Sequence, residues 1–190
     1  MPITINGSGT ITGVSVGGLP DGIVDSDMLA SGAITATGLP TGSVLQAVHT
    51  VYATQAANTT TTLADTGLSL SITPVAANSN ILVIVSQRIQ CYRNSVDSSY
   101  SNFYILRGST ILEDDNAQGV GYFGVYSNTS GVMQLYGLLP MQILDDPTYT
   151  LGDTITYKTQ HRPNTTAGGG QSIAQSNSKQ SRMTLLEIAG

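Results

Sequence analysis

The sequence predicts an all-β protein, a β-sandwich of the jelly-roll kind preceded by an extended N-terminal arm. Three observations predict this class. Only 10% of the 190 residues are charged, whereas about a quarter is usual, and Gly, Ser, Thr and Asn replace the residues that long helices need. Apolar and polar residues alternate at period two in several short segments. Turn-forming residues separate these segments, and the longer connections favour Greek-key crossings over a simple meander.

Residues 1–44 are expected to form an extended anchor or stalk, and residues 45–190 the β head. The arm contains no Lys, Arg or aromatic residue. Such a segment is ordered only where its backbone pairs with another sheet or another chain, and a disordered linker is the alternative. Residues 24–30 offer one or two helical turns behind an acidic N-cap. The candidate anchoring residues are spaced too thinly for a core of their own: Ile3, Ile5, Ile11, Val14 and Val16.

The head is expected to contain about nine or ten strands, of which 80–92 is the most apolar. Apolar residues occur on both parities of this segment, which predicts a central strand buried on both faces. In 132–144, one parity carries Met133, Leu135, Met141 and Ile143, which is typical of a half-buried strand. The strands expected are 45–53, 68–73, 80–92, 103–107, 110–112, 121–126, 132–144, 154–161 and 182–188.

The strands 132–144 and 154–161 are predicted to face each other across an acidic corner, Asp145-Asp146-Pro147. Pro147 ends the first strand because it has no amide hydrogen to donate and because it holds the preceding residue extended. Gly152 and Asp153 then supply the turn into the second strand.

Few side chains in this chain suit catalysis. Cys91 is the only cysteine, so no intrachain disulfide can form, and it is expected to be a small core residue. His49 and His161 are the only histidines, and His161 is expected to be exposed at a strand end. No catalytic signature surrounds these residues. The sequence therefore predicts a protein that is not an enzyme and has no cofactor.

The charge pattern limits the partners further. A net charge of −5 argues against nucleic-acid binding, which needs clustered Lys and Arg. No apolar run approaches the length of a membrane span, and no signal peptide is visible. The acidic segments 113–116 and 145–146, the latter with Asp153, suit either a Ca²⁺ site or a solvated turn.

Recognition of a ligand or receptor would be carried by loops, which tolerate variation while strands hold their position. The candidate loops are 92–100, 114–122 and 163–170. The candidate receptor residues are Tyr92, Tyr100, Tyr122 and Arg162. Tyrosine rings offer stacking surfaces for sugars, although burial in the core is the more common role of tyrosine.

Four segments carry a resemblance to known proteins. Residues 5–34 (INGSGTITGVSVGGLPDGIVDSDMLASGAI) resemble N-terminal segments of virion proteins from tailed phages, particularly phages of cyanobacteria and other aquatic bacteria. Residues 80–87 (NILVIVSQ), 143–160 (ILDDPTYTLGDTITYKTQ) and 183–190 (MTLLEIAG) resemble the C-terminal domain of many such fibre proteins. The resemblance implies a homotrimeric jelly-roll head, similar in plan to tumour-necrosis-factor-like and complement-type globular trimers.

The function implied is that of a virion structural protein, a short fibre or capsid decoration whose arm binds capsid or tail proteins of the same virion. The short arm favours this role over a long tail fibre. The alternative is a tail-fibre module that recognises a host cell-surface glycan, and a glycan-cleaving enzyme is a more distant one. The expected location is the virion, after synthesis in the bacterial cytoplasm, without membrane insertion.

Overall fold

The computed structural model describes residues 4–5, 11–12, 35, 38–95, 97–114, 117–127 and 130–190. The chain divides into two units, Met1–Leu39 and Pro40–Gly190. In the first unit, β1 (Thr4–Ile5) pairs antiparallel with β2 (Ile11–Thr12), which places the backbone of Ile5 opposite that of Ile11. The predicted helical turns at 24–30 and three of the anchor residues lie outside the described residues, namely Ile3, Val14 and Val16.

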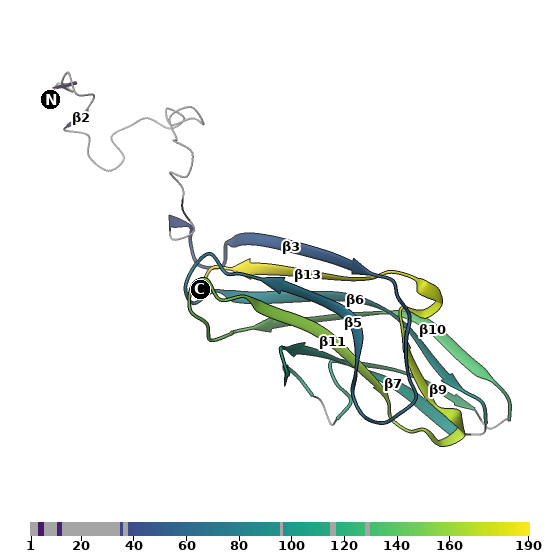
Figure 1. Cartoon of the computed structure of the whole chain (residues 1–190). Helices are drawn as coiled ribbons and strands as arrows, with labels where there is room; N and C mark the ends of the chain where they lie inside the picture. Colours follow the sequence, from purple (N-terminus) through teal and green to yellow (C-terminus); the bar gives the residue numbers. More distant parts are fainter. Residues whose placement is uncertain are drawn as a thin grey trace. The chain divides into compact units, whose positions relative to one another are not determined.

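The second unit is all-β and consists of two antiparallel sheets facing each other, the arrangement of a β-sandwich (Figure 1). The first, which we call the β6 sheet, contains β3 (Val44–Tyr52), β4 (Ala56–Asn58), β6 (Asn80–Arg93), β10 (Met133–Asp145), β12 (Gln171–Ala174) and β13 (Ser181–Ile188). The second, the β11 sheet, contains β5 (Ala64–Ile72), β7 (Asp97–Arg107), β8 (Thr110–Ile111), β9 (Gly121–Ser127) and β11 (Ile155–Pro163). Two short 3₁₀ turns, η2 (Ala167–Gly169) and η3 (Ser176–Ser178), flank β12.

Strand β6 organises the first sheet. One of its edges pairs with β10 along the whole strand, while the other pairs with β13 over its first half and with β12 over its second half. Strands β3 and β4 lie outside β13 and β12. In the β11 sheet, β11 lies between β5 and β7, and the far edge of β7 pairs with β9 and β8. Several strands that follow one another in the chain therefore lie in opposite sheets.

All nine predicted strands are present with shifted ends, and β4 and β12 were missed because neither is long enough to show an alternating pattern. The strands predicted around the acidic corner belong to different sheets, since β10 pairs with β6 whereas β11 pairs with β5 and β7. The corner therefore carries the chain from one sheet to the other.

The apolar core lies between the sheets. Its buried members come from alternate positions of both layers: Leu68, Ile72, Ile81, Val83, Val85, Ile89, Phe103, Ile105, Met141, Ile155, Tyr157, Ala174, Met183 and Leu185. The prediction that β6 is buried on both faces is wrong. Val83 is fully buried, but Ile84 remains 37% exposed, because the β11 sheet covers only one side of β6 and nothing within the described chain fully covers the other.

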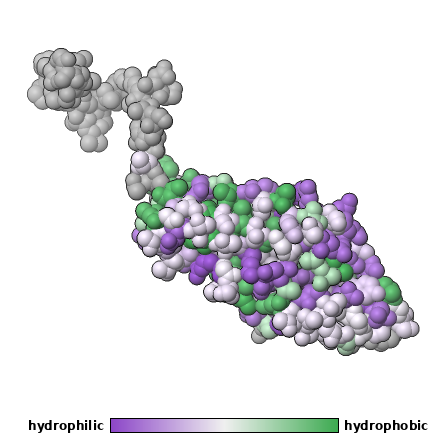
Figure 2. Space-filling model, viewed as in Figure 1, coloured by the Kyte–Doolittle hydropathy of each residue, from purple (hydrophilic) through white to green (hydrophobic). Residues whose placement is uncertain are grey.

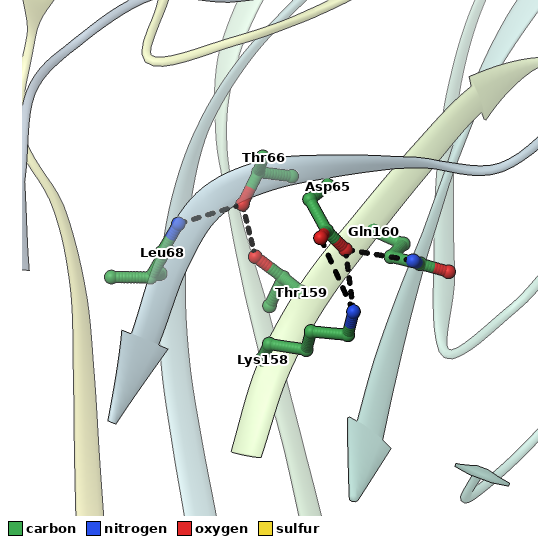
Figure 3. Close-up of polar contacts among 6 residues, drawn as sticks. All are labelled: Asp65, Thr66, Leu68, Lys158, Thr159 and Gln160. Carbon is green, nitrogen blue, oxygen red and sulfur yellow. Dashed lines mark hydrogen bonds and ion pairs between the residues drawn. The ribbon is translucent and has the colours of Figure 1, made fainter. Parts of the chain in front are cut away.

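A chain of hydrogen bonds also crosses the core between the two sheets. The Thr159 hydroxyl donates to Gln87 Oε1 (3.1 Å), and so accepts from Thr66 (2.6 Å), whose oxygen accepts from the amide of Leu68 (3.1 Å). Figure 3 shows the hydrogen bonds of this series that join β5 to β11. Gln87 Nε2 donates in turn to Ser181 on β13 (2.9 Å). Because each polar group of this network has a partner, the network fixes the two sheets in one alignment.

Candidate functional site

A pocket of about 270 Å³ opens on the outer face of the β11 sheet, and we call it the tyrosine pocket. Its lining residues are Tyr100, Asn102, Gln118, Tyr122 and Asn164. Strand β7 supplies the first two, because its odd-numbered residues such as Phe103 and Ile105 point into the core. Tyr122 lies directly opposite Asn102 on β9. Gln118 precedes β9, and Asn164 follows β11.

The two tyrosine rings meet edge to face, with centroids 5.9 Å apart and planes at 75°. This position of the Tyr100 ring depends on Gly124, the residue opposite it on β9. A Cβ atom at Gly124 would lie 2.1 Å from the ring, a separation at which atoms overlap. The glycine therefore lets the Tyr100 ring lie against β9 and reach Tyr122.

The backbone of Tyr100 is held from the other side by Asn164. The amide of Tyr100 donates to Asn164 Oδ1 (2.7 Å), and the amide of Asn164 donates to the carbonyl of Tyr100 (2.9 Å). Since Oδ1 is engaged, Nδ2 is the group of this side chain that remains as a donor for a ligand. The pocket is thus built from a fixed strand and a fixed loop.

Asn102 is 4% exposed, and only one end of its amide is satisfied. Nδ2 donates to the carbonyl of Ala117 (3.3 Å), whereas Oδ1 is buried with no hydrogen-bond partner among the described residues. A buried acceptor without a donor costs about 1–3 kcal/mol, and such groups are uncommon in folded proteins. This oxygen therefore marks a place where the described residues leave a hydrogen bond unmade.

Arg162 lies across the register from Asn102 but supports the pocket from outside. Its guanidinium donates to the Tyr104 hydroxyl (3.1 Å) and to two backbone carbonyls, those of Ala117 (2.8 Å) and Thr61 (3.3 Å). The Tyr104 hydroxyl donates to the same carbonyl of Ala117 (2.7 Å). Arg162 consequently holds the loop before β9 against β7.

The structure brings together part of the predicted receptor set. Tyr100 and Tyr122 share the pocket, and Arg162 lies beside it. Tyr92 is on β6, in the other sheet. Each of the three predicted loops contributes at least one lining residue. Asn102 was missed, since it lies inside a strand, and its only signal was an amide between two tyrosines of the same parity.

The outer face of the β6 sheet is the second candidate site. It carries a row of apolar side chains, and polar residues such as His49, Gln142 and Thr184 lie beside that row. Leu144, Leu82, Leu186 and Ala47 lie side by side in register across β10, β6, β13 and β3. We define the outer β6 face by this row and its apolar neighbours: Ala47, Val51, Leu82, Ile84, Tyr136, Leu138, Leu144, Leu186 and Ile188. Leu144 is 59% exposed and Leu138 52%. Figure 2 shows apolar residues over β3 with polar residues between them, and further apolar patches on the rest of this view.

Over β5 and β11, the outer face of the β11 sheet is polar by contrast. It carries hydroxyl groups on β5 and β11, such as Ser71, whose hydroxyl is 2.8 Å from that of Thr156. Lys158 pairs with Asp65 at 2.9 Å, and Gln160 donates to the same carboxylate (Figure 3). The hydrogen bond from Lys158 holds the pKa of Asp65 below its usual value. The outer faces of the two sheets therefore differ in polarity.

The sequence predicted that His161 is exposed, and this prediction is wrong. The side chain is buried, with 1% of its surface exposed. Its ring stacks on Phe103 with centroids 5.5 Å apart, and Nδ1 lies 2.9 Å from the Ser172 hydroxyl. Burial lowers the pKa of His161 to about 4. The prediction failed because β11 continues to Pro163 and because Ser172, on the unforeseen strand β12, packs over the ring.

Asp145, in the acidic corner, is buried with 9% of its surface exposed, so it does not belong to a solvated turn. This carboxylate accepts hydrogen bonds from Arg107 and Tyr157. Across the described ranges, no group of three His, Cys, Asp or Glu side chains could hold a metal ion. In the segment 113–116, Asp114 accepts a bond from the amide of Gly119 (3.2 Å). Cys91 is fully buried, as predicted, and burial raises the pKa of its thiol.

Comparison with protein-family models and with curated proteins finds no match to this chain. Within the described residues, none of the helices is long and apolar enough to cross a membrane.

Proposed function

We propose that this chain is a non-enzymatic structural protein of a phage virion, a trimeric short fibre or decoration protein. Residues 1–44 anchor it to capsid or tail proteins of the same particle, and the β head is displayed outward. The virion assignment is supported by the resemblance of residues 5–34 and 143–160 to phage virion proteins. The assembly is supported by one observation above all, the apolar outer β6 face.

The proposed head is a jelly roll. Eight principal strands, taken in chain order, are β3, β5, β6, β7, β9, β10, β11 and β13. Numbered one to eight in this order, they form one sheet with the order 1-8-3-6 and another with the order 2-7-4-5. Interleaving of this kind, with two Greek keys folded together, is what a jelly roll requires.

The outer β6 face needs a cover. An antiparallel sheet with one face in water normally carries polar residues on that face, as the β11 sheet does. On the outer β6 face, Leu144 and Ile84 meet water instead, and each large apolar side chain gains about 1.5–3 kcal/mol on full burial. Contiguous exposed apolar surface marks an interaction site.

Copies of the same chain are the proposed cover. Each copy lays its outer β6 face against its neighbour, and rotation about a threefold axis closes the ring, as most homo-oligomers close. The number three rests on the resemblance to trimeric heads. The short arms of three copies then lie together, which makes the ordering of each arm cooperative and offsets a backbone entropy cost of about 1–2 kcal/mol per residue.

A pair of neighbouring substitutions tests the assembly. Ile84→Asp places a carboxylate on the outer β6 face and is expected to give folded monomers, measured by sedimentation velocity and circular dichroism. Val83→Asp places the same charge in the core and is expected to unfold the head, because an unpaired buried charge is costly. Ser69→Asp, on the polar face of β5, is the matched control and leaves the trimer intact.

Two outcomes contradict the assembly. One is a wild-type protein that sediments as a monomer at micromolar concentration. The other is a trimer that persists in the Ile84→Asp variant. The anchoring role is tested separately by deleting residues 1–30, which is expected to leave a folded head that no longer joins the particle. Incorporation of the truncated protein would overturn the anchor assignment.

A second candidate function is recognition of a host cell-surface glycan. The tyrosine pocket favours it, because it combines two aromatic rings with three amide side chains on the outer face of the head. Both functions are compatible in one protein, since the pocket and the outer β6 face lie on opposite sheets.

A further inference from the structure

The tyrosine pocket offers two kinds of surface to a ligand. The rings of Tyr100 and Tyr122 present apolar faces, on which the C–H groups of a sugar ring can stack. The amides of Asn102, Gln118 and Asn164 present donors and acceptors of the kind that pair with hydroxyl groups. None of the five described lining residues is charged. This combination suits a neutral ligand rich in hydroxyls.

The unpaired oxygen of Asn102 points to the same ligand class. It has no donor among the described residues, and a ligand hydroxyl group is a donor. The oxygen has less than 1 Å² of accessible surface, so the Asn102 side chain must turn toward the pocket to meet that hydroxyl. Ligand sites are typically apolar surfaces with a few placed polar groups that fix orientation. Satisfying a buried acceptor in this way makes binding selective against analogues that lack the hydroxyl.

The pocket is already formed in the unbound protein. Asn164 holds the backbone of Tyr100, Gly124 leaves room for its ring, and Arg162 holds the loop before β9. A ligand therefore does not have to order these groups when it binds, and preorganisation of this kind improves affinity.

A second hollow of about 250 Å³ adjoins the pocket. The two share Gln118 and Tyr122, and the second is also lined by Glu113, Gly119, Val120, Gly121, Leu139 and Pro140. The carboxylate of Glu113 disfavours anionic ligands there, and the donors of the nearby Arg162 are directed at protein oxygens. The charges around both hollows therefore disfavour an anionic ligand.

We propose that the tyrosine pocket binds one ring of a neutral saccharide, with the next ring passing Tyr122 into the neighbouring hollow. The proposal deepens the second candidate function and rests on it, while it is independent of assembly and of attachment to a virion. A pocket of this size, just below the roughly 300–1,000 Å³ usual for ligand sites, holds a single ring rather than a long chain.

The test is a titration of the full-length protein with three neutral disaccharides, maltose, cellobiose and lactose, and with the anionic trisaccharide 3′-sialyllactose. Saturation-transfer difference NMR and intrinsic tyrosine fluorescence report binding, since the chain has nine Tyr and no Trp. At least one neutral disaccharide is expected to bind, and sialyllactose is expected to bind more weakly than lactose.

Four variants locate the site. Tyr122→Ala removes an exposed ring and is expected to weaken binding about tenfold, whereas Tyr122→Phe keeps the stacking face and most of the affinity. Gly124→Ala removes no group but displaces the Tyr100 ring, and it is expected to weaken binding similarly. The matched control is Tyr126→Ala. Tyr126 lies on the same face of β9, is 69% exposed, and is outside the pocket lining, so its loss is expected to leave affinity unchanged.

Three results would overturn the proposal: no neutral disaccharide binding at millimolar concentration, tighter binding of sialyllactose than of lactose, or affinity that is the same in Tyr122→Ala and in the wild type. The Ile84→Asp variant separates this proposal from the assembly, because a folded monomer is expected to bind with the same affinity per protomer. If neither the wild type nor any variant binds a saccharide, the sedimentation test of the trimer is unaffected. If the protein is a monomer, the test of saccharide binding is likewise unaffected.

Discussion

The hydroxyl of Tyr157 in β11 donates a hydrogen bond of 2.6 Å to Asp145, the last residue of β10. The bond joins the two sheets beside the corner that carries the chain between them. Arg107 on β7 donates to both oxygens of the same carboxylate, at 2.7 and 2.8 Å. Burial, together with the neighbouring carboxylate, raises the pKa of Tyr157. The hydroxyl consequently stays protonated and remains a donor at neutral pH.

Removing that hydroxyl is expected to destabilise the head moderately. Tyr157→Phe leaves Asp145 with Arg107 as its remaining partner, and the expected cost is about 1–3 kcal/mol of unfolding free energy, measured by urea denaturation. Asp145→Ala is expected to cost more, about 3 kcal/mol or above, because it leaves both the Arg107 guanidinium and the buried Tyr157 hydroxyl without this partner. The Arg107 side chain is 32% exposed, so water limits the second effect. Equal stability of Tyr157→Phe and wild type would contradict this role.

Glu187 is expected to make the head sensitive to acid. Burial alone would raise its pKa, but hydrogen bonds from Gln46, from the amides of Val75 and Ala76 and from Ser79 outweigh burial and hold the pKa below its ordinary value of 4.5. A depressed carboxyl pKa stabilises the fold above the unfolded value, and this stability is lost as the pH falls through the folded value. Stability should therefore decline below about pH 4.5.

The measurement is thermal melting of wild type and Glu187→Gln between pH 3 and 7. The variant is expected to be less stable at neutral pH, because charged hydrogen bonds contribute about 1.5–3 kcal/mol each, and to lose less stability on acidification. A Glu187→Gln variant with the wild-type pH profile would show that this carboxylate does not hold the loop between β5 and β6.

His161 is expected to act in a higher pH window. Its folded pKa is about 4, below the usual 6.5, because the ring is buried. The unfolded chain gains a proton as the pH falls below about 6.5 while the folded chain does not, so stability decreases from there until about pH 4. The loss is on the order of 3 kcal/mol.

Replacing His161 with Phe keeps a ring beside Phe103 and removes the titration, so the decrease between pH 6.5 and 4 should largely disappear. His49→Asn is the comparison variant, because His49 is the other histidine of the chain. If His161→Phe retains the wild-type slope in this window, another group is responsible.

Two glycines with the same backbone angle separate strain from crowding. Gly67 and Gly42 both have φ of +86°. A Cβ atom added at Gly67 would lie 2.4 Å from the Tyr52 ring. A Cβ atom added at Gly42 would have no atom of the other described residues within 4 Å. Gly42→Ala is expected to cost about 1 kcal/mol from the backbone alone. Gly67→Ala should cost roughly 1–3 kcal/mol more, because the ring that packs β3 against β5 must move. Chemical denaturation of both variants checks this, and equal costs would contradict it.

The head is expected to fold without the N-terminal unit. Every strand of the two large sheets lies within Pro40–Gly190, so deletion of residues 1–39 should leave the far-ultraviolet circular dichroism of a β protein and a cooperative melting transition. A truncated protein that melts without cooperativity would show that the arm is needed for the fold.

Much of the head could be predicted from the sequence because the period-two pattern belongs to each strand. Alternation in 132–144 located β10 and the inward position of Met141, whereas the apolar run in 80–92 located β6 without deciding which of its faces is buried. The position of Tyr100 and Tyr122 near loops was also accessible, since turn residues mark where strands end. These properties depend on a few neighbouring residues and need no knowledge of the rest of the chain.

Only the tertiary structure decided which strands become partners. β10 and β11 follow each other across one corner, yet they lie in opposite sheets. β10 pairs with β6, whereas β11 pairs with β5 and β7. The same long-range pairing buried His161 under β12 and exposed Ile84 on the outer β6 face. It also brought Asn102 beside Tyr122 on β9, Gln118 before β9 and Asn164 after β11. Contacts between residues far apart in the chain determine these outcomes, and a local pattern carries no record of them.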